Sequence, residues 1–223
     1  PHLPLRYDRD RLEAKAASKK ALLARTGLAP RLDRPLVGMV TRLVEQKGIE
    51  LLLAAAPRLL EMDLALVVLG SGRPAYEQEM RRLAAAHPDR VYYGSDFDDP
   101  LAHLIEAGAD MFLMPSRYEP CGLNQMMSLR YGTVPVVHRV GGLADTVRAV
   151  EDDPENGLGC VFDGYTPEAM TAALGRALAA YADPVRWRAM QRRGMAEDFT
   201  WDRSALRYES VYAGALARVR ARD

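Results

Sequence analysis

Three short stretches of the sequence place cations, a carboxylate or paired glycines directly before a helix-forming segment. The first contains Arg42 and Lys47, and a glycine follows Lys47 at once. Guanidinium and ammonium groups beside the free N–H groups of a helix start can bind an anion such as a phosphate. Because cations on loops are usually solvated, this stretch alone leaves open whether it binds anything.

The second stretch carries a carboxylate three residues before a glycine. Glu119 can accept several hydrogen bonds from sugar hydroxyl groups. Gly122 lets a phosphate approach the main chain closely, and Leu123 and Asn124 follow it at the predicted start of a helix. A simpler interpretation makes Glu119 a charge that stabilises this helix start and Cys121 a small buried apolar residue. From the residues alone, both interpretations stay open.

The third stretch is a pair of glycines, Gly141 and Gly142, that enters another helical segment. Such a pair suits close approach of the main chain to a phosphate or a sugar, although a lone glycine pair is more often a simple turn. Each of the three stretches follows a predicted strand. A single ligand with phosphates and hydroxyl groups would therefore satisfy all three, and the combination is stronger than any one of them.

Short apolar runs alternate with helical segments through most of the chain. Continuous apolar runs are typical of strands buried on both faces. The alternation predicts an α/β fold, a Rossmann-like doubly wound parallel sheet, with ligands at the carboxyl ends of the strands. The predicted strands are 35–41, 64–69, 91–93, 110–114, 134–137 and 160–162, and the predicted helices are 11–26, 48–61, 74–87, 99–107, 122–131, 143–149, 166–181, 184–197 and 202–221.

The first of these helices has clear start and stop signals. Asp10 followed by Glu13 has the spacing of a capping box, and Gly27 is a natural residue for the position just after a helix. The face that contains Lys15 and Lys19 is strongly basic. We interpret it as a solvated helix face rather than a binding surface.

Length and composition bound the kind of protein. The 223 residues suit one domain over 1–223, with a linker and first helix over 1–30 and a closing helix over 202–221. Acidic and basic residues balance at 30 each, so no global field favours nucleic acid or an anionic membrane. Cys121 and Cys160 make no disulfide framework, which predicts a cytoplasmic location. The apolar runs are too short to span a bilayer, and a start without Met or signal peptide predicts a fragment of a longer protein.

The three stretches and several others closely resemble bacterial glycogen synthases and plant starch synthases. The resemblance runs along nearly the whole chain, and the Glu-Pro-Cys-Gly-Leu run is its most specific part. It covers the C-terminal half of that family, which is one lobe of the two-lobed GT-B glycosyltransferase architecture. The segments that carry it are 41–43, 46–48, 107–110, 115–123, 130–135, 141–146 and 198–202.

The resemblance implies transfer of glucose from ADP-glucose to the non-reducing end of an α-1,4-glucan, with retention of anomeric configuration. It implies that Arg42 and Lys47 stabilise the leaving diphosphate, so no essential metal or other cofactor is expected. Main-chain N–H groups near Gly122, Leu123 and Asn124 would also hold phosphate. In the same family pattern the glucose is bordered by Glu119, Cys121, Gly141 and Gly142.

Three positions need separate comment. Phe97 falls where relatives carry a tyrosine that stacks on adenine, and a phenylalanine keeps the stacking face. A core aromatic is the other interpretation of Phe97, and both stay open. Asn124 stands where several relatives have Thr, and Val140 stands where Thr usually precedes the glycine pair. Val140 offers no hydroxyl, so a contact made by that hydroxyl in relatives is not expected here.

The resemblance implies that the family's N-terminal acceptor lobe is absent from this chain. Glycosyl transfer needs both lobes closed around the substrates, so the expected partners are ADP-glucose, the glucan and the missing lobe. The chain by itself is predicted to be inactive. Two alternatives remain: a nucleotide-binding module without turnover, and a GT-B enzyme that uses another donor such as UDP-glucose. Many enzymes of the latter kind have a second Glu eight residues after the first, where this chain has Met127.

Overall fold

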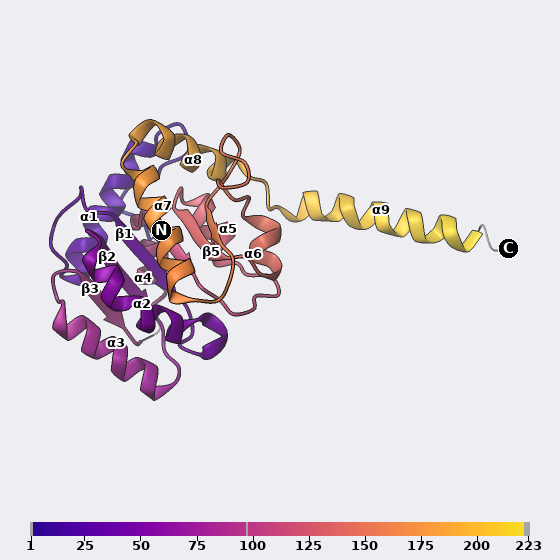
Figure 1. Cartoon of the computed structure of the whole chain (residues 1–223). Helices are drawn as coiled ribbons and strands as arrows, with labels where there is room; N and C mark the ends of the chain where they lie inside the picture. Colours follow the sequence, from indigo (N-terminus) through magenta and orange to yellow (C-terminus); the bar gives the residue numbers. More distant parts are fainter. Residues whose placement is uncertain (1, 97, 221–223) are drawn as a thin grey trace.

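Six parallel strands organise residues 2–96 and 98–220, which are the residues described by the computed structural model (Figure 1). The strand order is β3-β2-β1-β4-β5-β6, so β1 and β4 lie side by side where the winding direction reverses. This confirms the predicted doubly wound parallel sheet. The strands are β1 (Leu36–Val40), β2 (Ala65–Leu69), β3 (Val91–Gly94), β4 (Met111–Met114), β5 (Val134–His138) and β6 (Cys160–Phe162).

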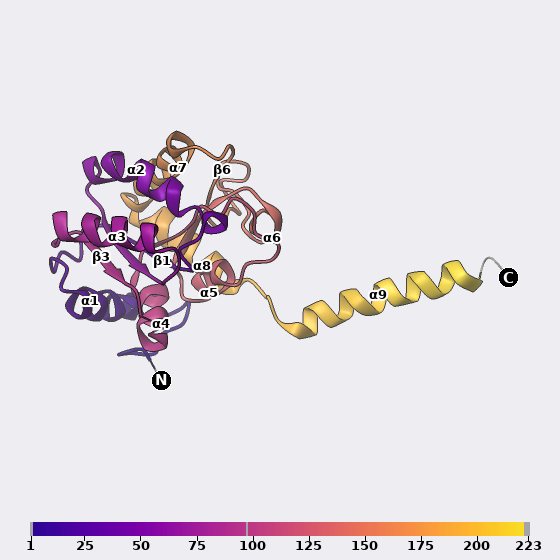
Figure 2. The same cartoon turned by 90° about the horizontal axis from the view of Figure 1, so that it is seen from below.

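Helices cover both faces of the sheet, with α2 and α7 on one side and α1 and α4 on the other (Figure 2). Successive strand residues point to opposite faces, so Val37 and Met39 lie in one core and Leu36 lies in the other. Burial on both sides explains why the strands are continuously apolar. The helices are α1 (Lys15–Thr26), α2 (Ile49–Glu61), α3 (Pro74–Ala86), α4 (Asp99–Gly108), α5 (Asn124–Arg130), α6 (Gly141–Thr146), α7 (Pro167–Tyr181), α8 (Pro184–Ala196) and α9 (Trp201–Arg220), with 3-10 turns η1 (Leu12–Ala14) and η2 (Glu45–Lys47).

The first α-helix begins later than predicted. The 3-10 turn η1 precedes it, and no side-chain cap is formed by Asp10 or Glu13. The carboxylate of Asp8 accepts a hydrogen bond from the main-chain N–H of Asp10 at 3.0 Å instead. The capping-box prediction is therefore wrong. Gly27 ends α1 in the left-handed region with a φ of 71°, as predicted.

Two lysines of α1 are buried near the amino ends of the strands, so the prediction of a solvated face is wrong for them. Lys15 donates to the main-chain oxygen of Ala107 and, at 2.7 Å, to the hydroxyl of Thr133. Burial lowers the pKa of Lys15 from its ordinary 10.5 to about 7, against the opposing charge of Asp110. Lys19 forms an ion pair with Asp110 at 2.6 Å. Acceptors from remote segments thus replace water around both ammonium groups.

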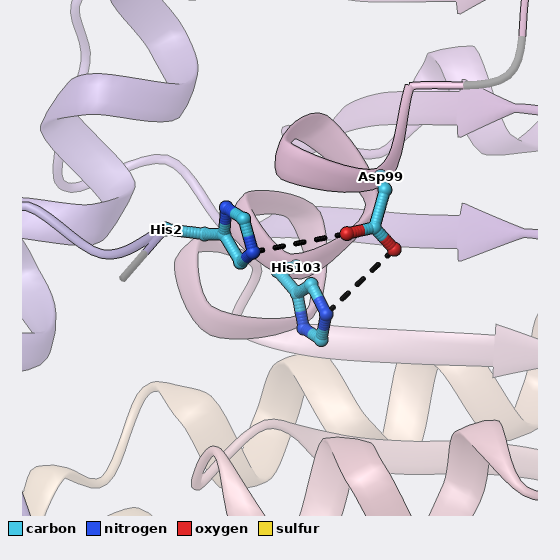
Figure 3. Close-up of side chains that lie close together, drawn as sticks. All are labelled: His2, Asp99 and His103. Atoms are coloured by element: carbon cyan, nitrogen blue, oxygen red, sulfur yellow. Dashed lines mark ion pairs between the residues drawn. The ribbon is translucent and has the colours of Figure 1, made fainter.

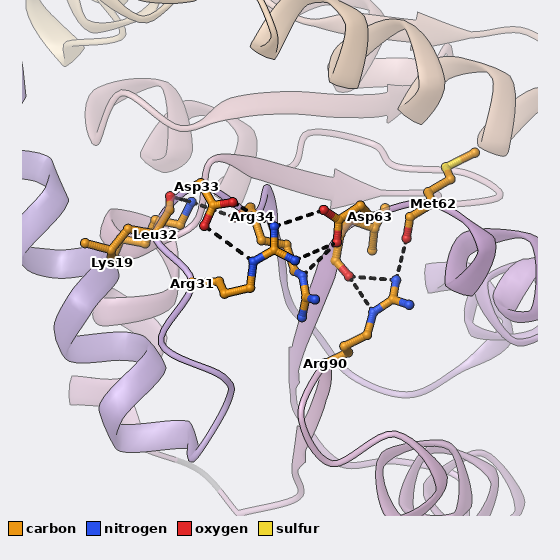
Figure 4. A network of polar contacts seen from close by, with 9 residues as sticks. Lys19, Arg31, Leu32, Asp33, Arg34, Met62, Asp63 and Arg90 are labelled. Carbon is orange, nitrogen blue, oxygen red and sulfur yellow. Dashed lines mark hydrogen bonds and ion pairs between the residues drawn. The ribbon is translucent and has the colours of Figure 1, made fainter.

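Arginines and carboxylates form a network near the same end of the sheet (Figure 4). Arg31 reaches Asp33 at 2.7 Å and Asp63 at 3.2 Å, and Arg34 reaches Asp63 at 2.9 Å. Arg90 donates to two main-chain oxygens of the connection between α2 and β2. The network joins the segments that lead into β1, β2 and β3, and it helps to set the register of these neighbours.

The last helix, α9, extends away from the rest of the domain (Figures 1 and 2). None of its residues is buried, so the closing helix predicted over 202–221 is present but does not pack on the sheet. Among residues 2–96 and 98–220, no helix combines the length and apolar character needed to cross a membrane. The large apolar side chains that α9 exposes are Trp201, Leu206, Tyr208, Val211, Tyr212, Leu216 and Val219.

Candidate functional site

A cleft of about 370 Å³ opens at the carboxyl ends of β1 and β2. Its walls come from the ends of these strands, the loop after β3 and the first turns of α4 and α5. It lies next to the β1–β4 switch point, which is where doubly wound folds bind their ligands. Arg42, Lys47 and Asn124 all line it.

The loop after β1 positions the two predicted cations. The 3-10 turn η2 ends at Lys47, and Gly48 follows in the left-handed region with a φ of 73°. A Cβ at Gly48 would lie 2.1 Å from the main-chain oxygen of Pro115, so only glycine lets this loop press against the segment after β4. Arg42 is exposed, and its guanidinium lies 3.4 Å from the side-chain oxygen of Gln46. Both cations therefore lie after the carboxyl end of β1 and line the cleft.

Glu119 lies beside the cleft and is only 7% exposed. Its Oε2 forms an ion pair with Lys47 and accepts a hydrogen bond from the hydroxyl of Ser116 at 3.1 Å. The main-chain oxygen of Ser116 lies 2.8 Å from Nδ1 of His138, at the end of β5. Within the described part of the chain, Oε1 of Glu119 has no hydrogen-bond partner. Oε2 therefore anchors the carboxylate, and Oε1 remains available to accept a hydrogen bond.

The turn before α5 is held by a buried amide that sequence reasoning did not single out. Gln125 is fully buried, and its Nε2 donates at 3.1 Å to the main-chain oxygens of Cys121 and Gly122. The same nitrogen reaches the hydroxyl of Thr146 on α6 at 3.1 Å. Because these bonds keep the chain in a turn, α5 starts at Asn124, two residues later than predicted.

The predicted binding residues of this turn have different surroundings. Asn124 lines the cleft, and its Nδ2 donates to the main-chain oxygen of Val40 at 2.7 Å. The side chain of Leu123 is 61% exposed and lines a separate hollow of about 980 Å³, so only its main chain remains a candidate phosphate contact. Cys121 is exposed, which overturns its interpretation as a small buried apolar residue. Among the described residues, the N–H groups of Gly122, Leu123 and Asn124 have no protein acceptor.

The glycine pair packs against the turn that carries Glu119. α6 begins at Gly141, two residues earlier than predicted. The N–H of Gly142 donates to the main-chain oxygen of Glu119 at 2.9 Å, and a Cβ at Gly142 would lie 1.9 Å from the main-chain oxygen of Cys121. The amide of Gly142 is thus committed to the protein. The close approach that requires glycine here is between two loops of the chain.

The structure brings most of the predicted residues into one neighbourhood. Arg42, Lys47 and Asn124 share the cleft, and Glu119 adjoins it through its ion pair with Lys47. The glycine pair and the turn before α5 reach the same place through the contacts above. Phe97, predicted to stack on adenine or to lie in the core, is outside the described residues.

The cleft also has acidic groups that the sequence prediction missed. Asp96 and Asp98, from the loop between β3 and α4, line it. Asp98 accepts from the N–H of Leu101 at 2.9 Å and pairs with Arg25 at 2.6 Å. These two contacts hold the pKa of Asp98 below its ordinary value, so it is a carboxylate at neutral pH. The sequence signals for these residues were their position in the loop after a predicted strand and, for Asp98, its place just before the predicted helix 99–107, where it is the N-cap of α4.

The sheet order and the cleft at its switch point define a doubly wound α/β domain, and the comparisons that follow match it to one lobe of a GT-B glycosyltransferase. A family model described as glycosyl transferases group 1 matches residues 23–193. The chain belongs to this family. The matched residues include all the strands of the sheet and all the cleft-lining stretches described above.

Sequence and structure comparisons confirm the resemblance to glycogen and starch synthases. The chain is 58% identical over 212 residues to a glycogen synthase of Anaeromyxobacter dehalogenans, covering 95% of this chain and 44% of that protein. It is 53% identical to a glycogen synthase of Geotalea daltonii, covering 92% of this chain and 42% of that one. The catalytic domain of Arabidopsis thaliana starch synthase IV, bound to ADP and acarbose, matches with a TM-score of 0.89 at 35% identity, covering 97% and 46%. The chain therefore spans less than half the length of these relatives.

Proposed function

We propose that this chain is the donor-binding lobe of a retaining glucosyltransferase that moves glucose from ADP-glucose to the non-reducing end of an α-1,4-glucan in glycogen synthesis. The observation that carries the proposal is the convergence of Arg42, Lys47 and Asn124 on one cleft at the switch point. Identity above 50% to glycogen synthases over nearly the whole chain supports the substrate class. The solved starch synthase relative, which was bound to ADP, supports a nucleoside diphosphate in this lobe.

The charges of the cleft suit a leaving diphosphate. Breaking the bond between the anomeric carbon and oxygen leaves negative charge on the departing ADP. Preorganised cations aimed at that charge lower the barrier more than they lower the energy of the bound substrate. Arg42 is exposed, and among the described residues Glu119 is the only hydrogen-bond partner of the Lys47 ammonium. Both side chains therefore have N–H donors left for a phosphate. We expect them to serve in place of a metal ion, and the reaction to need no essential metal.

The sugar side of the proposed site is Glu119 with its surroundings. Its Oε1 is the acceptor that a glucose hydroxyl would use, while Oε2 stays bonded to Lys47 and Ser116. The carboxylate thereby links the sugar to the cation that faces the diphosphate. Cys121, Gly141 and the main chain of Gly142 border the same space in the proposal. No enzyme nucleophile is proposed, and Cys121 is assigned a contact role.

The proposal includes a second lobe that supplies the acceptor side. The relatives are about twice as long as this chain, and transfer needs closure around both substrates to exclude water. The unburied apolar face of α9 is available for contact with such a lobe. We therefore expect the 223-residue chain to bind nucleotide without catalysing transfer.

Nucleotide titration of this chain tests the proposal. A ligand at a hundredfold excess over its Kd stabilises the folded state by about 2.7 kcal/mol, which raises Tm by roughly 5–10 °C for a domain of this size. ADP is expected to produce this shift. Arg42→Ala and Lys47→Ala are expected to remove it, whereas Lys20→Ala, an exposed lysine outside the cleft, should keep it.

Three results would contradict parts of the proposal. An unchanged melting curve at millimolar ADP would remove the donor-binding assignment. Glucose incorporation into glycogen by this chain alone would contradict the need for a second lobe. Tighter calorimetric binding of UDP-glucose than of ADP-glucose would favour the alternative donor, against the indication from Met127, which stands where many such enzymes carry a second Glu.

A further inference from the structure

A cluster of potential metal ligands lies outside the donor cleft. His2, Asp99 and His103 come together at the first turns of α4 (Figure 3). Nε2 of His2 lies 3.7 Å from Oδ2 of Asp99, and Nε2 of His103 lies 3.8 Å from Oδ1. One ligand atom from each residue lies within 4.8 Å of the other two. Sequence reasoning did not single out these three residues, and His2 is far from the other two along the chain.

The fold explains why these three side chains meet. Asp99 and His103 are one turn apart on α4, so they share a face of the helix. The leading segment is anchored by Tyr7, whose hydroxyl donates to the main-chain oxygen of Tyr131 at 2.9 Å. This anchor brings His2 back over α4, where its ring stacks on that of His103 with centroids 5.1 Å apart.

The hydroxyl of Tyr131 is a hydrogen-bond partner of one proposed ligand, the imidazole of His103. Nδ1 of His103 lies 3.0 Å from the hydroxyl oxygen of Tyr131. When Nε2 of a neutral imidazole binds a metal, Nδ1 carries the proton and donates it to an outer partner. Tyr131 is placed to accept that hydrogen bond. Such outer partners orient the ring of a ligating histidine and are a general feature of metal sites in proteins.

We propose that His2, Asp99 and His103 bind one zinc ion, with water in the remaining position. Two imidazoles and a carboxylate suit zinc, whereas magnesium and calcium prefer oxygen ligands alone. Zinc bonds of 2.0–2.2 Å place tetrahedral ligand atoms about 3.4 Å apart. The two nitrogen–oxygen distances of 3.7 and 3.8 Å thus need to shorten by about 0.3–0.4 Å on zinc binding. Because they run to different oxygens of Asp99, a carboxylate that binds zinc through one oxygen must also turn.

Zinc binding also requires one imidazole ring to turn. The two rings are parallel within 4°, and a shared ion must lie near the plane of each ring. The side chain of His2 is 34% exposed and that of Asp99 is 55% exposed, so both have room to adjust. His103, held by Tyr131, would stay in place and act as the fixed ligand.

The bound ion would tie the leading segment to α4 beside the donor cleft. Asp98 and Ala102 of this region line the cleft, and the ligands Asp99 and His103 are the residues that follow each of them. The ion would act on the fold and take no part in glucose transfer. The zinc proposal therefore does not depend on the donor assignment, which ADP binding to metal-free protein tests separately.

Calorimetric titration of the chelator-treated 223-residue chain with zinc chloride tests this site. We expect one ion per chain and at least tenfold weaker binding in His2→Ala, Asp99→Asn and His103→Ala. His87→Ala, which removes a histidine outside the cluster, should bind zinc like the unaltered chain. Cobalt substituted for zinc should give the intense visible absorption of a tetrahedral site, and Tyr131→Phe should weaken zinc binding about tenfold although all three ligands remain.

The variants keep the test decisive even if one of them folds poorly. The side chain of His2 is exposed, so His2→Ala leaves the core intact. Equal zinc affinity in His2→Ala, His103→Ala and His87→Ala would overturn the proposal. Binding of magnesium chloride as tightly as zinc, or a titration without saturation near one ion per chain, would also overturn it.

Discussion

Two lysine–carboxylate pairs lie at opposite ends of the same sheet and differ in how fully the protein satisfies them. Lys19 pairs with Asp110 near the amino ends of the strands, and its ammonium also reaches Leu32, Arg34 and Tyr181. Lys47 pairs with Glu119 at the carboxyl ends, where it lines an open cleft. Among the described residues, Glu119 is the only hydrogen-bond partner of its ammonium.

The difference separates a lysine that holds the fold from one that is available to a ligand. An ammonium has three N–H donors, and around Lys19 the protein supplies acceptors for all of them. Lys47 keeps donor capacity that an anion can use. A buried charged residue is thus not by itself a sign of function, and the number of donors left unsatisfied is the more useful signal.

Replacement of the saturated lysine should have the largest effect on stability. Lys19→Met leaves Asp110 buried without its cation and two main-chain oxygens without this donor, so we expect a loss of about 3–5 kcal/mol in the free energy of unfolding. Urea unfolding measures this loss. Lys20→Met, at the exposed neighbouring position, is the control and should change stability by no more than about 0.5 kcal/mol. Equal losses of stability in both variants would contradict the structural role assigned to Lys19.

The pH dependence of stability tests the second buried lysine at the same end. The folded pKa of Lys15 is about 7, below its ordinary 10.5, because burial disfavours the charged form. Between these values the unfolded chain holds a proton that the folded chain has released. The free energy of unfolding should therefore rise with pH, by up to about 1.4 kcal/mol per pH unit from this residue. Urea unfolding between about pH 7 and 9 should show a flatter slope in Lys15→Met, and an identical slope would contradict the shift.

The smallest loss of stability is expected at the cleft. Lys47→Met should lower the free energy of unfolding by about 1–3 kcal/mol, because it leaves the buried carboxylate of Glu119 without its cation but with the hydroxyl of Ser116. Lys19→Met also removes the donor of two main-chain oxygens, so its loss should be larger. The same urea measurements allow direct comparison with Lys19→Met. A loss as large as that of Lys19→Met would show that the Lys47–Glu119 pair holds the fold, and the contrast between the two ends would fail.

Much of the fold could be predicted because it depends on local patterns. Each of the six strands occurs where a continuous apolar run predicted it, since a sheet buried on both faces leaves no polar alternation. Gly27 ended α1 as expected because its left-handed conformation is a local property of the chain. The starts of α5 and α6 were wrong by two residues each, because the buried amide of Gln125 and the packing of Gly142 on Cys121 decide them.

The candidate site could be predicted only in part. The positions of Arg42, Lys47 and Glu119 after predicted strands placed them at one sheet edge, and the structure brings them together there. Of the acidic residues of the cleft, Asp96 carries no pattern beyond a loop position, and Asp98 carries only that of a helix N-cap. Whether the side chain of Leu123 points into the cleft or to another hollow depends on the turn that precedes α5.

The order of apolar and helical segments by itself determined that this chain forms a doubly wound parallel sheet with polar loops along one edge. Only the tertiary structure decided which lysines are buried, which glycines separate packed loops and which side chains share a cleft. The physical reason is that apolar burial follows from periodicity within one element. The satisfaction of a charge depends on acceptors from remote segments, as the contacts of Lys15 and Lys19 with Ala107 and Asp110 illustrate.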